Sequence, residues 1–181
     1  GVGNRYSGES ALSDDGRYVA FWSYASNLVP NDTNDMPDIF VYDRQTGEMT
    51  RVSVHTDGHE ADGGSFAPAI SGDGRYVAFE SSATTLVDVT KNQQVDVYVH
   101  DRQTGETSLA SVHSDGTPGD FRSVRPQLNG NGRFVTFTTR ATNLVDNDTN
   151  GRDDVFVHDL WLGETVRVSV DSNGNEGNGY S

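Results

Sequence analysis

A nine-residue stretch occurs three times in this chain at a constant spacing of 58 residues, and it restricts the possible folds more than any other feature. The copies are Ser-Asp-Asp-Gly-Arg-Tyr-Val-Ala-Phe at 13–21, Ser-Gly-Asp-Gly-Arg-Tyr-Val-Ala-Phe at 71–79 and Asn-Gly-Asn-Gly-Arg-Phe-Val-Thr-Phe at 129–137. A fixed period of this length is the signature of an array of supersecondary units. We expect one domain over 1–181, made of repeats 13–70, 71–128 and 129–181, with 1–12 supplying an innermost lead-in strand.

The composition favours strands over helices. Of the 181 residues, 33% are hydrophobic and 20 are glycine. This balance suits an all-β protein with many turns. No window sustains apolar residues at i, i+3, i+4 and i+7, so the sequence predicts essentially no helix.

Each repeat begins with a strand and a tight turn. Pro68 and Pro126 lie in the first strand of their repeats, and proline restricts a strand to a sheet edge, which is the innermost position in a radial sheet. The Asp-Gly or Asn-Gly pair that follows supplies the positive φ that a hairpin needs. A second strand comes next, at 18–22 in the first repeat and 76–79 in the second.

The remaining two strands differ in pattern. The third, at 38–43, 96–101 and 154–159, is a nearly continuous apolar run, which indicates that both of its faces are covered. The fourth, at 51–54 and 167–170, alternates, which is typical of a half-exposed outer strand. Four-stranded sheets of this kind are the blades of a β-propeller.

The repeat also resembles a known family. The motif Pro-x-(apolar)-Ser-x-Asp-Gly-Arg-Tyr-Val-Ala-Phe, followed by Asp-Val-Tyr-Val-His-Asp-Arg-Gln-Thr-Gly-Glu, is similar to the TolB-type, WD40-like (PD40) β-propeller repeat of bacterial proteins. The resemblance covers all three repeats and implies a propeller, but these repeats serve many roles and do not set a function. The third repeat departs at Leu160, Trp161 and Leu162, and we interpret this apolar patch as a contact surface.

Three blades are too few for a ring, because propellers have about four to eight. We expect two chains to complete a six-bladed ring with two-fold symmetry. The alternative is that the chain is part of a longer propeller.

The charge indicates which partners to expect. A formal net charge of −14 repels nucleic-acid backbones and anionic lipid headgroups. The chain has no cysteine and no transmembrane run, which fits an exported bacterial protein, periplasmic or extracellular. We therefore expect no nucleic-acid partner and no membrane insertion.

Both long loops of each repeat, 24–37 and 55–65 in the first, are expected at the end of the ring opposite the tight turns. Loops on a rigid scaffold usually carry function. The third repeat places oxygen ligands here with the spacing of a calcium loop. The predicted ligands are Asp146, Asp148, Asn150, the backbone of Arg152, and Asp154.

The other repeats carry weaker versions of this motif. The residues are Asp32, Asn34 and Asp38 in the first repeat and Asp88, Asn92 and Asp96 in the second. The alternative for all three loops is an Asx turn, in which Asp and Asn bond to their own backbone.

Catalytic signals are weak. His100 and His158 share one repeat position with Tyr42, and His55 and His113 share another with Asp171. A position that accepts tyrosine is typical of packing or hydrogen bonding. Glu60 and Asp62 lie in a long loop and leave a glycosidase-type carboxylate pair open as an alternative.

The sequence thus predicts a non-enzymatic propeller scaffold or binding module for a protein or glycan, with Ca²⁺ as its candidate cofactor. The alternative is the propeller domain of an exported hydrolase that acts on glycans or peptides.

Overall fold

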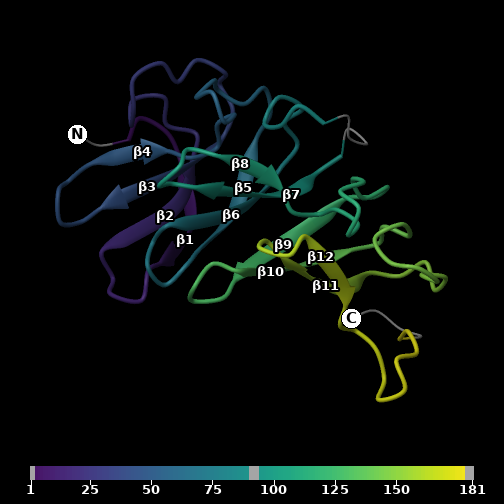
Figure 1. Ribbon diagram of the computed structural model, residues 1–181. Helices are drawn as coiled ribbons and strands as arrows, with labels where there is room; N and C mark the ends of the chain where they lie inside the picture. The colour runs from purple at the N-terminus through teal and green to yellow at the C-terminus, as the bar shows by residue number, and fades with distance from the viewer. Residues whose placement is uncertain (1–2, 90–93, 178–181) are drawn as a thin grey trace.

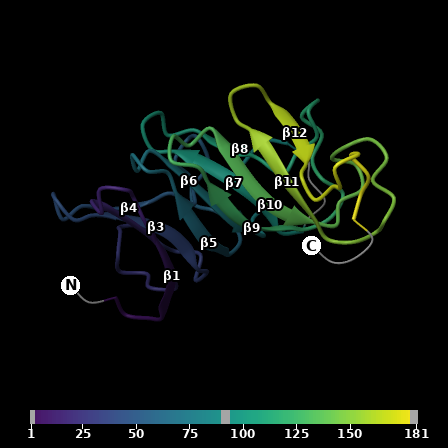
Figure 2. The same ribbon diagram turned by 90° about the horizontal axis from the view of Figure 1, so that it is seen from below.

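The computed structural model describes residues 3–89 and 94–177, and within these ranges the chain folds into three four-stranded antiparallel sheets. The described residues contain no helix, so none that could cross a membrane. Figures 1 and 2 show the sheets side by side in chain order, with the N-terminal sheet at one end of the molecule and the C-terminal sheet at the other. The prediction of an all-β fold is confirmed.

Each sheet is built from four consecutive strands, so each is one blade. Blade 1 contains β1 (Ser7–Leu12), β2 (Tyr18–Ser23), β3 (Asp38–Asp43) and β4 (Met49–Arg51). Blade 2 contains β5 (Ser65–Ile70), β6 (Tyr76–Ser81), β7 (Asp96–Asp101) and β8 (Thr107–Leu109). Blade 3 contains β9 (Ser123–Leu128), β10 (Phe134–Thr139), β11 (Asp154–Asp159) and β12 (Glu164–Arg167).

The first strand of each blade is an edge strand with a bulge. The register between β5 and β6 shifts between Phe66 and Ala69, and Ala67 next to Pro68 has φ of 50°. Arg125 next to Pro126 repeats this with φ of 59°. The proline therefore lies where the ladder is already interrupted, as expected for an edge strand.

Two apolar cores join the blades. We call the face of a blade that contacts the blade before it the leading face, and the opposite one the trailing face. Ile39, Val41 and Val52 on the trailing face of blade 1 pack against Val77 and Phe79 on the leading face of blade 2. A second core joins the equivalent faces of blades 2 and 3.

The third strands show how this packing follows the sequence. β7, in the middle blade, has its first five residues buried, whereas β11 alternates between buried and half-buried residues. The continuous apolar run of the third strand thus predicts two covered faces correctly for the middle blade. In β11 the half-buried positions lie on the trailing face, which no blade covers here.

The outer strands lie earlier in the chain than the predicted 51–54 and 167–170, and each ends three residues sooner. β4 ends at Arg51 and β12 at Arg167. After β4, Ser53 turns its hydroxyl to the carboxylate of Asp38 at 2.5 Å, and Val54 pairs with Glu60 across a separate hairpin. The chain leaves the ladder because these side-chain and hairpin bonds replace it.

Candidate functional site

The long loops of each blade meet at one end of the molecule. Glu60, in the loop after β4, accepts hydrogen bonds from the backbone N–H (2.9 Å) and the hydroxyl (2.7 Å) of Thr33, in the loop after β2. Thr149 and Glu176 form the same pair in blade 3. The tight turns lie at the other end, where Arg44 donates a hydrogen bond to the carbonyl oxygen of Gly16.

An arginine lies at the centre of the acidic cluster in blade 1. Nη1 of Arg51 contacts Glu60 and lies 3.4 Å from Asp38 and 3.9 Å from Asp32. The arginine side chain is only 9% exposed and Asp38 is fully buried. A buried cluster of carboxylates needs a compensating cation, and here the guanidinium provides it.

Blade 3 repeats this arrangement around Arg167. Its Nη1 lies 2.9 Å from Glu176, 3.3 Å from Asp148 and 4.0 Å from Asp154. The arginine is again almost completely buried. One arginine, one glutamate and two aspartates therefore form an arginine-centred carboxylate cluster in both the first and the third blade.

Burial shifts the pKa of the acids in these clusters. Burial raises the pKa of Asp38 to about 6, although Ser53 and Arg51 act against this. Burial also raises the pKa of Asp32 and Asp148. The pKa of Glu60 is lowered, because the hydrogen bonds from Thr33 and the charge of Arg51 outweigh its partial burial.

Blade 2 lacks the arginine and the glutamate of this cluster. Leu109 and Pro118 occupy the corresponding repeat positions. Asp96 is buried and accepts a hydrogen bond from Ser111 at 3.2 Å. Asp88 is exposed and lies 3.5 Å from the ring of His55, and Asn92 lies outside the described residues.

The structure brings together only part of the predicted calcium ligands. Asp148 and Asp154 share the cluster of Arg167, whereas Asp146 is exposed. Asn150 directs its amide nitrogen to Asp154 at 2.8 Å, and its oxygen accepts from the backbone N–H of Arg152 at 2.7 Å. Asn34 makes the same bonds to Asp38 and Met36, so both asparagines form Asx turns.

Sequence reasoning missed Arg51, Arg167 and Glu176 as members of these clusters. Among the described residues, Asp32, Asp38 and Glu60 form the one group of potential metal ligands with oxygens within 4.8 Å of one another. As arranged, the residues do not fit a bound calcium ion, because the guanidinium already lies among the carboxylates. An ion could bind only if the arginine moved away.

The buried histidines have structural partners. Nδ1 of His100 lies 2.9 Å from the hydroxyl of Thr107, which bonds to the carbonyl oxygen of Val54 in the preceding blade. His158 and Thr165 repeat this contact. These pairs link neighbouring blades.

The remaining candidate histidines and loop acids each have a different structural role. His55 and His113 begin tight turns closed by Gly58 and Gly116. Asp62 accepts hydrogen bonds from Thr84 and Thr85, while Glu60 bonds to Thr33 and Arg51. Each acid thus serves a different contact between loops.

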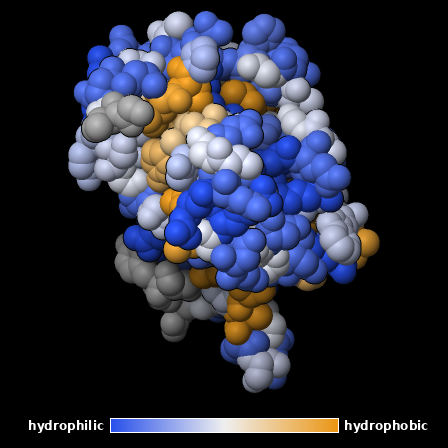
Figure 3. Space-filling model, turned by 90° about the vertical axis from the view of Figure 1, so that its left-hand side faces the viewer, coloured by the Kyte–Doolittle hydropathy of each residue, from blue (hydrophilic) through white to orange (hydrophobic). Residues whose placement is uncertain are grey.

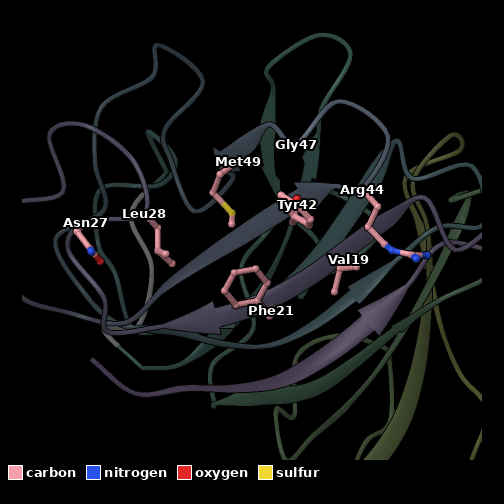
Figure 4. A pocket seen from close by; sticks show the side chains of 8 residues that line it. All are labelled: Val19, Phe21, Asn27, Leu28, Tyr42, Arg44, Gly47 and Met49. Atoms are coloured by element: carbon pink, nitrogen blue, oxygen red, sulfur yellow. The ribbon is translucent and has the colours of Figure 1, made fainter. Parts of the chain in front are cut away.

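The two outermost blade faces are open. A groove of about 740 Å³ lies on the leading face of blade 1, lined by Val19, Phe21, Leu28, Tyr42 and Met49 together with Asn27, Arg44 and Gly47. Figure 4 shows the side chains of Val19, Phe21 and Met49 directed into this space. Figure 3 shows hydrophobic residues gathered between hydrophilic ones on this side of the molecule.

Known structures with this fold are β-propellers. No family model and no curated relative matches the chain. The structure is similar to a protein described as a TolB from Agrobacterium tumefaciens (TM-score 0.58, 19% identity, 91% of this chain and 49% of that one). It is also similar to an oligogalacturonate lyase (0.56, 14%, 91% and 41%) and to the propeller domain of the Trilobed protease from Pyrococcus furiosus (0.53, 12%, 90% and 41%).

Three radial four-stranded sheets and these similarities show a β-propeller segment. Its fold is that of the TolB-like propellers, which confirms the resemblance seen in the repeats. The chain spans half or less of the length of the structures it matches. The same fold occurs in TolB and in the propellers of peptidases and a lyase.

Proposed function

We propose that this chain is a non-enzymatic propeller scaffold that binds a protein or a glycan through its long-loop end. The main support is that carboxylates at that end are engaged in hydrogen bonds between loops of the chain itself. Glu60, Glu176 and Asp62 each accept hydrogen bonds from a threonine of a neighbouring loop. A carboxylate held in this way fixes the loop conformation and is a poor candidate for proton transfer.

The test compares binding with turnover. The chain is assayed against chromogenic glycosides and peptide amides, and its mobility is measured in gels that contain soluble polysaccharides. We expect no turnover, with retardation by a polysaccharide or complex formation with a purified protein ligand. Turnover that disappears in Glu60→Gln and not in Glu48→Gln, an exposed acid in a tight turn, would overturn the proposal and favour the hydrolase alternative.

We also propose that the chain is exported and that it associates with itself to complete a six-bladed ring. The absence of cysteine and the net charge of −14 support an extracellular or periplasmic location. The two open apolar faces at the ends of the stack support self-association.

We also propose that calcium binds at the third loop, which requires that Arg167 moves away from its carboxylates. The carboxylate oxygens of Asp148 and Asp154 support this proposal, and the guanidinium of Arg167 would compete with the ion for them. The melting temperature measured with millimolar Ca²⁺ and with chelator tests it directly. A higher melting temperature in Ca²⁺ that Mg²⁺ does not reproduce supports the site, and equal melting temperatures overturn it.

A further inference from the structure

Consecutive blades are joined by backbone hydrogen bonds at residues one repeat apart. The N–H of Asp14 donates to the carbonyl oxygen of Gly72 at 2.9 Å, and the N–H of Gly72 donates to Gly130 at 2.8 Å. Within the described residues this series ends at the carbonyl oxygen of Asp14 and the N–H of Gly130. The two ends are complementary, since one accepts and the other donates.

A second contact between blades places a glycine turn on an aromatic ring. A Cβ atom at Gly74 would lie 2.1 Å from Cδ2 of Tyr18, and one at Gly132 would lie 2.2 Å from Cδ2 of Tyr76. Both glycines are buried by the ring of the preceding blade. Gly16 is the equivalent residue of blade 1, and the nearest atom to a Cβ there is Nη1 of Arg44 at 3.7 Å.

The same ring also receives an arginine. The guanidinium of Arg102 lies 4.4 Å from the centre of the Tyr18 ring in the preceding blade. Arg44 is the equivalent arginine of blade 1, and the ring equivalent to Tyr18 in blade 3 is Phe134. The two halves of this contact therefore occur at opposite ends of the stack. Blade 1 carries the arginine and the glycine, Arg44 and Gly16, and blade 3 carries the ring, Phe134.

The apolar faces at the two ends also match the internal ones. The groove residues Val19, Phe21 and Leu28 correspond to Val77, Phe79 and Leu86, which are completely buried against blade 1. On the trailing face of blade 3, Val168 is 46% exposed. Its equivalents Val52 and Ala110 are buried in the two inter-blade cores.

We propose that a second copy of this chain covers the groove, with the leading face of blade 1 packed on the trailing face of blade 3 of the other copy. Arg44 and Gly16 then lie on Phe134 of the second copy, and the N–H of Gly130 meets the carbonyl oxygen of Asp14. This inference rests on the proposed self-association into a six-bladed ring and specifies the faces that would meet. It continues the geometry of the two internal interfaces, and a head-to-tail contact made twice closes a ring.

One contact differs from the internal interfaces. Thr107 and Thr165 each donate a hydroxyl hydrogen bond to the preceding blade, and the residue at this position in blade 1 is Met49. Methionine donates no hydrogen bond, so the contact between copies lacks this bond. We expect an association that is reversible at micromolar concentration.

The experiment uses two variants that each damage one face. Met49→Asp alters the groove and Val168→Asp alters the opposite face, and both residues are at least partly exposed in the single chain. Val89→Asp, at a 47% exposed position in the long loop after β6 of the middle blade, is the matched control. Sedimentation equilibrium at 1–100 µM gives the mass, and circular dichroism confirms the fold of each variant.

We expect wild type and Val89→Asp to reach twice the mass of one chain, and each face variant alone to be a monomer. An equimolar mixture of Met49→Asp and Val168→Asp should again form dimers, because it retains one intact head-to-tail interface. A monomeric wild type or growth into larger species overturns both this interface and the proposed six-bladed ring. A face variant that dimerises alone overturns this interface and leaves self-association standing. Turnover in the assay above would overturn the scaffold role and leave these masses unchanged, so the two failures are distinguishable.

Discussion

The hydroxyl of Thr107 donates a hydrogen bond to the carbonyl oxygen of Val54 at 2.6 Å, and this bond joins the outer strand of blade 2 to the loop that leaves blade 1. A hydroxyl has one hydrogen to donate, so Thr107 must accept from Nδ1 of His100, 2.9 Å away. The buried histidine therefore carries its hydrogen on Nδ1. The three groups form a hydrogen-bonded chain across the inter-blade contact.

Replacing Thr107 with valine keeps its shape and removes this chain. The buried N–H of His100 and the half-buried carbonyl of Val54 then lose a partner, so we expect a loss of about 1–3 kcal/mol in the free energy of unfolding. Urea denaturation measures this. Thr50→Val is the control, because its hydroxyl makes only a 3.4 Å contact within its own sheet. Equal effects of the two substitutions would show that the inter-blade bond adds nothing.

His100 should make the stability depend on pH. Burial lowers the pKa of His100 from 6.5 to about 4. Between these values the unfolded chain binds more protons than the folded one, so this contribution to stability is complete above pH 6.5 and is lost as the pH falls toward 4. His100→Asn retains a donor N–H near Nδ1 but does not titrate in this range. As the pH falls to 4, the free energy of unfolding of wild type should therefore decrease by about 3 kcal/mol more than that of His100→Asn. Urea midpoints at pH 4 and pH 7.5 give this difference.

Asp38 should give a pH dependence of stability opposite in sign to that of His100, so it serves as a control. Burial raises the pKa of Asp38 from 3.8 to about 6, so the folded chain binds more protons in this interval. Its contribution to stability therefore grows as the pH falls from 6 to about 4. The difference between wild type and Asp38→Asn should change in the direction opposite to that for His100→Asn. The same direction for both variants would contradict the assigned shifts.

The period of the sequence was enough to predict the blades, because the Asp-Gly turns and apolar third strands recur at equivalent positions. The acidic clusters were predicted only in part. The members that were not predicted could have been found by comparing the repeats. The first and third repeats have an Arg–Glu pair, Arg51 with Glu60 and Arg167 with Glu176, and the second repeat replaces both residues, with Leu109 and Pro118. Pairs that change together between repeats indicate contact. The direction of the Asn150 amide depends on side-chain hydrogen bonding that the spacing of residues does not encode.

The glycine turns give a prediction about packing between blades. Gly74→Ala adds a Cβ atom against the ring of Tyr18 and also forces alanine to φ of 74°. Gly116→Ala has a similar φ of 87° and no atom within 4 Å of the added Cβ. The positive φ costs each variant about 1–2 kcal/mol, and overpacking costs Gly74→Ala a further 1–3 kcal/mol or so. Equal thermal unfolding of the two variants would mean that the ring moves aside freely.

The arginine-centred clusters give the last prediction, which also bears on calcium. Arg167→Met keeps much of the side-chain volume and leaves Asp148, Asp154 and Glu176 without their cation. Removing one partner of a buried ion pair costs about 3–5 kcal/mol. Arg5→Met is the control, because Arg5 and Asp35 are 48% and 77% exposed and such pairs contribute about 0–1 kcal/mol. Since the guanidinium lies where an ion would bind, Ca²⁺ should restore part of the lost stability in Arg167→Met and none in Arg5→Met. Calorimetric unfolding with Ca²⁺ and with chelator checks this, and a loss in Arg167→Met no larger than that in Arg5→Met would show that the carboxylates do not need the arginine.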